Sequence, residues 1–126
     1  MLRTGMDIIE VYRVDEAILS HGERFLERVY TESELVEANG RTSSLAARFA
    51  AKEAVMKALG TGIRGVGWRD IEVTRKRGGA PQITLHNRGS ARAARMGMTQ
   101  IAISISHSRE YAVVSAVMSV DEDSHH

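Results

Sequence analysis

The sequence of 126 residues predicts an α+β fold, in which helices early in the chain pack on an antiparallel sheet formed later. Two segments carry this prediction. Residues 43–59 combine six alanines with bulkier apolar residues at helical spacing, which is typical of a helix buried on most sides. Ile101, Ile103 and Ile105 instead alternate with small residues, which indicates a half-buried strand.

Local signals define the other elements. Apolar residues around Asp7 predict a short buried strand from Met6 to Val11. Thr31 and Glu34 form a capping box, which should begin a short helix that ends at Gly40. Further helices are expected over 14–19, 23–29 and 87–96. Further strands are expected over 71–73 and 83–85, as a hairpin turning at 78–79, and over 100–106 and 111–117.

The composition fits one soluble globular domain, which we place at residues 1–119, with a polar tail at 120–126. The absence of cysteine excludes disulfides, Cys-ligated zinc and a cysteine nucleophile. The net charge of +1 argues against a broadly basic nucleic-acid binder. No stretch resembles a signal peptide or a transmembrane helix, so we expect a cytoplasmic protein without a membrane partner. The two terminal histidines are native or the start of a purification tag, and they carry no metal argument.

Two carboxylates stand in apolar surroundings. Asp7 lies inside an apolar strand, where an unpaired buried charge is costly, so it is either a metal ligand or an exposed residue at a strand end or helix cap. Glu53 continues the row of Leu45 and Phe49 on the alanine-rich helix. It forms either an i,i+4 ion pair with Lys57 or, in a buried position, a site for a divalent metal ion.

Other candidate binding residues give weaker signals. Arg48 and Lys52 share another face of the same helix, where they either neutralise phosphates or reach solvent. The glycine-rich segment 60–65 follows a helix instead of opening one, which excludes a phosphate-binding P-loop. His107 ends a predicted strand between two serines, where it is either structural or faces an anion. No second histidine stands at metal spacing, so zinc chemistry is not expected.

Three motifs follow one another along the chain: Gly5-Met6-Asp7-Ile8, residues 48–62 (RFAAKEAVMKALGTG) and Ser104-Ile105-Ser106-His107-Ser108. Shorter matches fall at 25–31 and 79–81. Together they resemble the holo-acyl-carrier-protein synthase family, the short-chain 4'-phosphopantetheinyl transferases, from Gly5 to about Val117. The resemblance implies the phosphopantetheinyl transferase fold and a homotrimer, with coenzyme A bound in clefts between neighbouring subunits.

The activity implied by this resemblance is a magnesium-dependent transfer of 4'-phosphopantetheine from coenzyme A to a serine of apo acyl carrier protein. It releases adenosine 3',5'-bisphosphate and supports fatty acid biosynthesis. Asp7 and Glu53 would ligate Mg²⁺ with water and a pyrophosphate oxygen, which suits an ion that uses few carboxylates. Lys57 would contact the pyrophosphate and stabilise or protonate the leaving phosphate. Glu53 would take the serine proton, directly or through a water.

Binding residues also follow from the resemblance. Arg48 and His107 would lie near the 3'-phosphate of coenzyme A, and Pro81 with the turn 106–108 would border the adenosine. Because the cleft is shared, His107 could serve the coenzyme A of another subunit. The residues expected to bind coenzyme A are Arg48, Lys57, Gly60, Pro81, Ser106, His107 and Ser108. Those expected to dock the acidic carrier protein are Arg13, Arg24 and Arg28.

Two alternatives stand beside this interpretation. A nucleic-acid-binding module would use the arginines of 88–95 and the basic turn 75–77. The sequence has only six aromatic residues for base stacking, namely two Phe, three Tyr and one Trp, so we expect no nucleic-acid partner. A non-catalytic trimeric scaffold would bind coenzyme A without turnover. Trp68 has no role in any of the family motifs.

Overall fold

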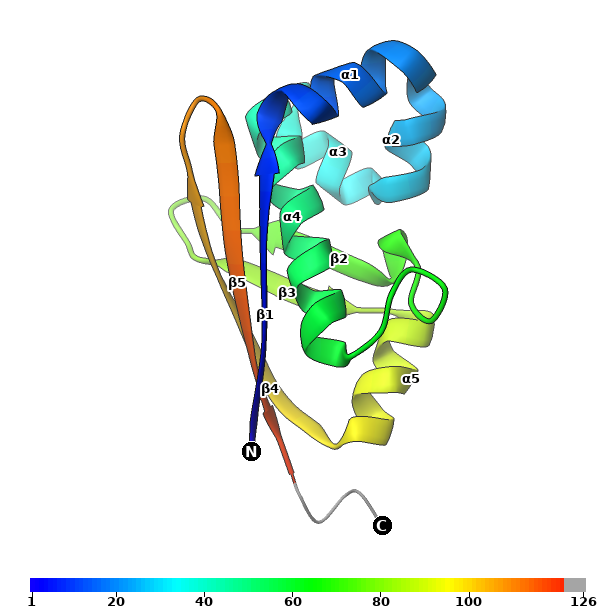
Figure 1. Cartoon of the computed structure of the whole chain (residues 1–126), viewed down its shortest axis with the longest axis vertical. Coiled ribbons are helices and arrows are strands. Elements are labelled where there is room, and N and C mark those ends of the chain that lie inside the picture. Colours follow the sequence, from blue (N-terminus) through cyan, green and yellow to red (C-terminus); the bar gives the residue numbers. More distant parts are fainter. Residues whose placement is uncertain (122–126) are drawn as a thin grey trace.

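The computed structural model describes residues 1–121 (Figure 1). The helices are α1 (Val11–His21), α2 (Glu23–Val29), α3 (Glu32–Ala38), α4 (Thr42–Leu59) and α5 (Asn87–Met96), with a 3-10 turn, η1, at Trp68–Asp70. The strands are β1 (Leu2–Glu10), β2 (Ile71–Arg75), β3 (Pro81–Leu85), β4 (Met98–His107) and β5 (Tyr111–Val120). The α+β class is confirmed. No helix among residues 1–121 is long and apolar enough to cross a membrane.

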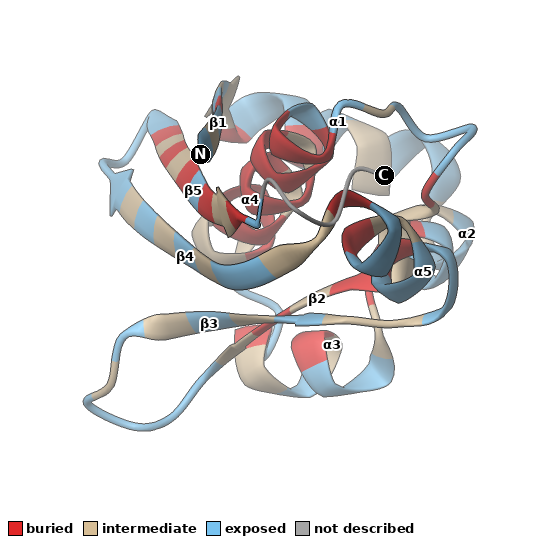
Figure 2. Ribbon diagram, turned by 90° about the horizontal axis from the view of Figure 1, so that it is seen from below, coloured by how far each residue is buried: buried red, intermediate tan, exposed pale blue. Residues whose placement is uncertain are grey.

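The strands form two antiparallel sheets, where the sequence predicts one. A three-stranded sheet has the order β1-β5-β4, so the first strand pairs with the last, and β2 and β3 form a separate hairpin. Helix α4 packs on one face of the three-stranded sheet, mainly against β1 and β5, and the hairpin lies with β3 next to the edge strand β4 (Figure 2). Although β3 and β4 are neighbours, no backbone pairing joins these two strands, so the hairpin does not extend the larger sheet.

Helix α4 is the centre of the core, as its alanines predict. Ala50, Ala54 and Ala58 are fully buried, and the small side chains let β1 approach closely. At Gly5 on β1, an added Cβ would lie 2.0 Å from the carbonyl oxygen of Ala54. Gly5 is therefore required by backbone contact, because no side chain fits between β1 and α4.

Strand β1 differs from the short buried strand expected over Met6 to Val11. It runs from Leu2 to Glu10, Val11 already begins α1, and the side chains of Met6 and Ile8 are 63% and 61% exposed. Side chains in a strand point alternately to the two faces. Asp7 and Ile9 therefore face α4, while Met6 and Ile8 face outward.

The helix boundaries follow the predicted signals. The capping box of Thr31 and Glu34 is present at the start of α3, and α4 ends at Gly60 in a left-handed conformation. Strand β5 continues through the buried Val120, beyond the expected range 111–117. Most of the predicted tail, with both terminal histidines, lies outside the described residues.

Candidate active site

A cavity of about 420 Å³ opens where β1, α1, α2 and α4 meet. Its polar lining consists of Asp7 on β1, Arg13 on α1 and Glu53 on α4. The apolar lining residues are Ile8, Ile9, Val14, Ala17, Phe25 and Phe49. We refer to this space as the carboxylate cavity.

The two carboxylates predicted to ligate metal therefore share one cavity, although they lie far apart in sequence. Burial raises the pKa of Glu53, the negative charge of Asp7 raises it further, and Lys57 opposes both effects. The mutual repulsion shows that the two carboxylates interact electrostatically. A cation between or beside them would relieve it.

Lys57 places one positive charge beside Asp7. Its Nζ lies 3.1 Å from Oδ1 of Asp7 and donates a hydrogen bond of 2.8 Å to the carbonyl oxygen of Met6. Among the described residues the ion pair of Lys57 is thus with Asp7, and not with Glu53 as the i,i+4 alternative supposed. The ammonium side chain is 55% exposed, so it remains accessible to a ligand.

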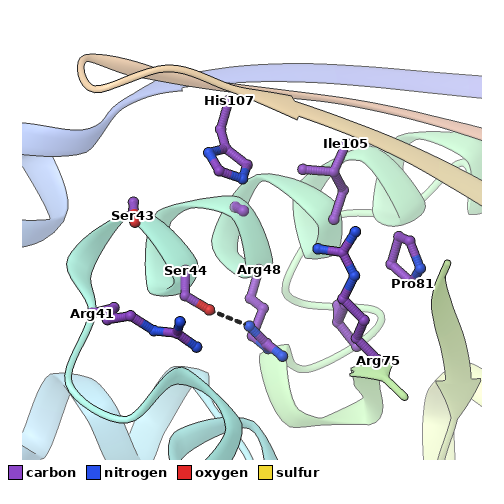
Figure 3. Close-up of a pocket in the computed structure, with 10 residues that line it drawn as sticks. Arg41, Ser43, Ser44, Arg48, Arg75, Pro81, Ile105 and His107 are labelled. Atoms are coloured by element: carbon purple, nitrogen blue, oxygen red, sulfur yellow. Dashed lines mark hydrogen bonds between the residues drawn. The ribbon is translucent and has the colours of Figure 1, made fainter. Parts of the chain in front are cut away.

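A second cavity, of about 160 Å³, lies between the start of α4, the β2–β3 hairpin and the end of β4 (Figure 3). We call it the basic cavity. Arg48, Pro81 and His107, which are distant in sequence, all line it as the family pattern implies. The lining residues that the sequence analysis did not assign are Arg41, Ser43, Ser44, Ala47, Val73, Arg75 and Ile105.

Arg48 lines the basic cavity, and Glu37 and Ser44 hold its guanidinium group in place. Its Nη2 lies 2.7 Å from Oε1 of Glu37, and its Nη1 donates to the hydroxyl of Ser44. Its Nε is buried and has no hydrogen-bond partner within residues 1–121. A phosphate in the cavity would therefore meet the guanidinium groups of Arg41 and Arg75 as well as that of Arg48.

Lys52 neither faces a phosphate-binding cavity nor reaches solvent, the two alternatives that the sequence left open. The side chain is fully buried, and Nζ lies 2.7 Å from Oε1 of Glu34. It also donates to the carbonyl oxygens of Trp68, at 2.9 Å, and Ile71, at 2.6 Å. Burial lowers the pKa of Lys52, while Glu34 acts in the opposite direction. Lys52 is thus a buried structural cation that joins α4 to α3 and β2.

The remaining predicted coenzyme A residues lie in different places. Ser106 is exposed on β4, and the hydroxyl of Ser108 accepts hydrogen bonds from the backbone N–H groups of Glu110 and Tyr111. Both serines are next to His107 in sequence, but neither is among the residues that line the basic cavity. Gly60 ends α4, roughly 18 Å along the helix from Arg48. The structure therefore does not bring Gly60 to the basic cavity.

The predicted docking arginines lie on one side of the carboxylate cavity. Arg24 and Arg28 of α2 line a groove together with His21 and Phe25. Phe25 also lines the carboxylate cavity, and Arg13 lines that cavity directly. The groove and the carboxylate cavity therefore adjoin at Phe25, with arginines lining both. The sequence analysis missed His21, because an isolated exposed histidine gives no pattern.

The carboxylate cavity suits a magnesium ion. Within residues 1–121 no group of three or more His, Cys, Asp or Glu side chains is placed to hold a metal. Asp7 and Glu53 instead offer two carboxylates next to open space. Magnesium usually binds one or two carboxylates and completes its octahedron with phosphate and water oxygens.

Comparison with known proteins agrees with this arrangement. The model of the 4'-phosphopantetheinyl transferase superfamily matches residues 3–115. The holo-[acyl-carrier-protein] synthase of Moorella thermoacetica is 47% identical over 121 residues, covering 94% of each chain. That of Koribacter versatilis is 43% identical over 122 residues, covering 94% of this chain and 98% of the relative.

Solved structures show the same fold. The holo-[acyl-carrier-protein] synthase of Helicobacter pylori, in complex with coenzyme A, superposes with a TM-score of 0.84 at 32% identity, covering 92% of this chain and 99% of that one. The enzyme of Bacillus anthracis, in complex with CoA (3',5'-ADP), gives a TM-score of 0.76 at 36% identity and covers 94% and 96%. With its fold, cavities and sequence in agreement, this chain belongs to the 4'-phosphopantetheinyl transferase superfamily.

Proposed function

We propose that this protein is a holo-[acyl-carrier-protein] synthase, which transfers 4'-phosphopantetheine from coenzyme A to a serine of apo acyl carrier protein. The observation that carries the proposal is the convergence of Asp7 and Glu53 on one cavity, with Lys57 beside them. The names of the relatives support the reaction, and the complexes of the H. pylori and B. anthracis enzymes support coenzyme A as the substrate. Activation of carrier protein for fatty acid biosynthesis is the general context.

Mg²⁺ is the proposed metal, held by Asp7 and Glu53. When bound, it supplies charge neutralisation at the pyrophosphate of coenzyme A. The raised pKa of Glu53 supports this assignment, since burial and the nearby charge of Asp7 disfavour the ionised form of Glu53 in the absence of a cation. Chemical fit agrees, because both donors are hard oxygen ligands.

The side chains of this chain then account for the transfer. The serine hydroxyl of the carrier protein attacks the β-phosphorus, the bond from that phosphorus to the bridging oxygen breaks, and adenosine 3',5'-bisphosphate leaves. Glu53 is the candidate base for the serine proton, directly or through a water, because its carboxylate lines the cavity beside Asp7. Lys57, which is exposed beside Asp7, would stabilise or protonate the leaving phosphate.

The basic cavity is the proposed site for the 3'-phosphate end of coenzyme A. Arg41, Arg48, Arg75 and His107 surround it, and Pro81 offers an apolar surface for the adenosine. Arginine suits phosphate because its planar guanidinium donates two parallel hydrogen bonds. Ser106 and Ser108 would act from the turn next to His107. Gly60 would contribute at the other end of α4, near Lys57.

Carrier protein is proposed to dock along α1 and α2. Arg13, Arg24 and Arg28 would meet the acidic surface of the carrier, and the groove that holds Arg24 and Arg28 leads to the carboxylate cavity. Such charge pairing mainly accelerates association and selects the partner. The serine would thereby be delivered next to Glu53.

A homotrimer is proposed as the assembled form. The outer face of the β1-β5-β4 sheet carries exposed apolar side chains from Leu2, Met6, Ile8 and Val117. An apolar sheet face of this kind is usually covered by another element or another subunit. Assembly would place the basic cavity of one subunit near the carboxylate cavity of its neighbour.

The proposal is tested by mass spectrometry of apo carrier protein incubated with coenzyme A, Mg²⁺ and this protein. The expected result is a mass increase of one phosphopantetheine, which disappears in EDTA. Asp7→Ala and Glu53→Ala should each reduce turnover at least about 100-fold while remaining folded, because several kcal/mol of charge stabilisation are lost. Glu32→Ala, an exposed carboxylate on α3, is the matched control and should retain full turnover. A wild-type protein that binds coenzyme A without modifying the carrier would instead indicate a scaffold.

A further inference from the structure

We infer that Trp68 is a positioning residue for the transfer, acting through Phe49 on the carboxylate cavity; this inference rests on the proposed function. Trp68 is the only tryptophan of the chain and lies in η1, outside the family motifs and outside the lining of that cavity. Its effect on the reaction must therefore pass through other residues.

A ladder of aromatic rings connects Trp68 to the cavity wall. The indole stacks on the ring of Phe49, with centroids 4.7 Å apart and planes inclined by 27°. Phe49 in turn stacks on Phe25, at 6.3 Å and 29°. Phe25 and Phe49 both line the carboxylate cavity. Trp68 therefore packs against the cavity wall through Phe49, without lining the cavity itself.

Phe49 stands one helical turn before Glu53 on α4, so their side chains are neighbours on one face. Trp68 contacts the same stretch of helix a second time, because its carbonyl oxygen accepts a hydrogen bond from Nζ of Lys52 at 2.9 Å. Lys52 directly precedes Glu53 and is also fixed by Glu34 and Ile71. Trp68 therefore contacts α4 at two points, Phe49 and Lys52, in the helical turn that directly precedes Glu53.

The ring stack favours the observed position of Phe49. Stacked aromatic pairs stabilise each other beyond the area that they bury. A smaller side chain at position 68 would leave a void behind Phe49, and this ring could then tilt away from Glu53. A displacement of about 1 Å in a reacting group can cost as much as 100-fold in rate. The 3'-phosphate end of coenzyme A would still bind in the basic cavity, which Trp68 does not line, so KM for coenzyme A should change much less than kcat.

Steady-state kinetics with coenzyme A and apo carrier protein test this role. Trp68→Leu, which removes the ring, should lower kcat by about 5- to 20-fold and leave KM for coenzyme A within about two-fold. Trp68→Phe, which keeps a ring, should restore kcat to within about two-fold of wild type. Met96→Ala is the control for lost stability: Met96 is buried in α5, away from both cavities, and its truncation should lower Tm without lowering kcat. Circular dichroism confirms that each variant is folded at the assay temperature.

A double-mutant cycle shows whether Trp68 acts through Phe49. Phe49→Leu alone and Phe49→Leu/Trp68→Leu should have similar kcat values, because the second change removes a contact already lost. Losses that multiply would overturn the inference, as would a Trp68→Leu variant with wild-type kcat or a loss of kcat matched by Met96→Ala. If Trp68→Leu does not fold, Trp68→Met takes its place with the same expectations. Wild-type turnover is measured separately, so a failure of the transfer activity itself is distinguishable.

Discussion

Glu53 is the residue at which stability and function oppose each other. Burial and the charge of Asp7 raise its pKa, so the folded chain binds the proton of Glu53 more tightly than the unfolded chain does. Such a carboxylate lowers stability at neutral pH. The loss disappears as pH falls through the folded-state pKa to the ordinary value near 4.

Glu53→Gln should therefore raise Tm by roughly 1–3 °C at pH 7.5 without Mg²⁺, a small shift because the group is partly screened by solvent. The same variant should lose transfer activity. The increase in Tm should vanish near pH 4, where the wild-type carboxyl is protonated. Differential scanning calorimetry of both proteins at the two pH values measures this. A lower Tm for the variant at pH 7.5 would contradict the proposed repulsion.

Lys52 and Glu34 form the opposite kind of pair, buried and fully hydrogen-bonded. Besides Lys52, Glu34 accepts hydrogen bonds from the N–H groups of Thr31 and Val73. Lys52→Met would leave a buried unpaired carboxylate and should lower the free energy of unfolding by about 3–5 kcal/mol. Adding Glu34→Gln replaces the unpaired carboxylate with a neutral amide and should restore at least about 1 kcal/mol of the free energy of unfolding. Urea unfolding of the single and double variants measures the difference. A double variant as unstable as the sum of its singles would show that the pair is not coupled.

Among the elements, the contact between β1 and α4 sets the geometry of the active site. It depends on Gly5, two residues before Asp7, where a Cβ would lie 2.0 Å from the carbonyl oxygen of Ala54. Gly5→Ala must push the two elements apart, and it should lower the free energy of unfolding by about 3 kcal/mol. Gly62→Ala is the matched control, since nothing lies within 4 Å of its added Cβ and its backbone is unstrained. It should change stability by no more than about 1 kcal/mol. Equal stability of the two variants in urea would refute the close contact.

The hairpin β2–β3 is fastened to the helices by a carboxylate with a lowered pKa. Glu72 on β2 accepts a 2.6 Å hydrogen bond from the hydroxyl of Thr31, and its other oxygen lies 3.0 Å from Nε2 of His86. The bond from Thr31 is the largest cause of the lowered pKa of Glu72, and His86 also contributes. A carboxylate with a depressed folded-state pKa adds stability above its unfolded value, and this stability is lost as pH falls through the folded value.

Glu72→Gln should therefore cost about 1 kcal/mol at pH 7. The difference in free energy of unfolding between wild type and variant should disappear as pH falls below about 4. Urea unfolding at pH 7 and at pH 3 compares the two proteins. A difference that stays constant over this range would mean that ionisation of Glu72 contributes nothing to the stability of the hairpin.

Elements were more predictable than the contacts between them. The alanine-rich helix and the isoleucine alternation of β4 are local patterns, and each produced the predicted element. The division into two sheets was not predictable, because β3 lies next to β4 without pairing with it, and such a long-range arrangement leaves no local pattern. Asp7 and Glu53 were found because charge in an apolar pattern is a local signal. The pairing of Lys52 with Glu34 was missed because the partner lies on another helix, and Arg41 was missed because an exposed arginine has no pattern.

At the scale of the whole molecule, the outer face of the three-stranded sheet must be explained. The side chains of Met6, Ile8 and Val117 lie on this face, which none of the helices within residues 1–121 covers (Figure 1). Exposed apolar side chains scattered singly need no partner, but neighbours on one sheet face form a continuous patch. This patch is the physical basis for the proposed trimer.

Val117→Lys should break that trimer, because a charge in the middle of the patch would be buried without a partner on assembly. Sedimentation equilibrium should give three times the chain mass for wild type and a single chain mass for the variant. Val36→Lys is the matched control: Val36 is an exposed valine on α3, away from the sheet, and this variant should remain trimeric. The Val117→Lys monomer should fold with little loss of stability, since the substituted side chain faces outward. It should nevertheless lose turnover, because the basic cavity of one subunit would no longer adjoin the carboxylate cavity of another. A monomeric variant with wild-type turnover would show that one chain holds a complete site.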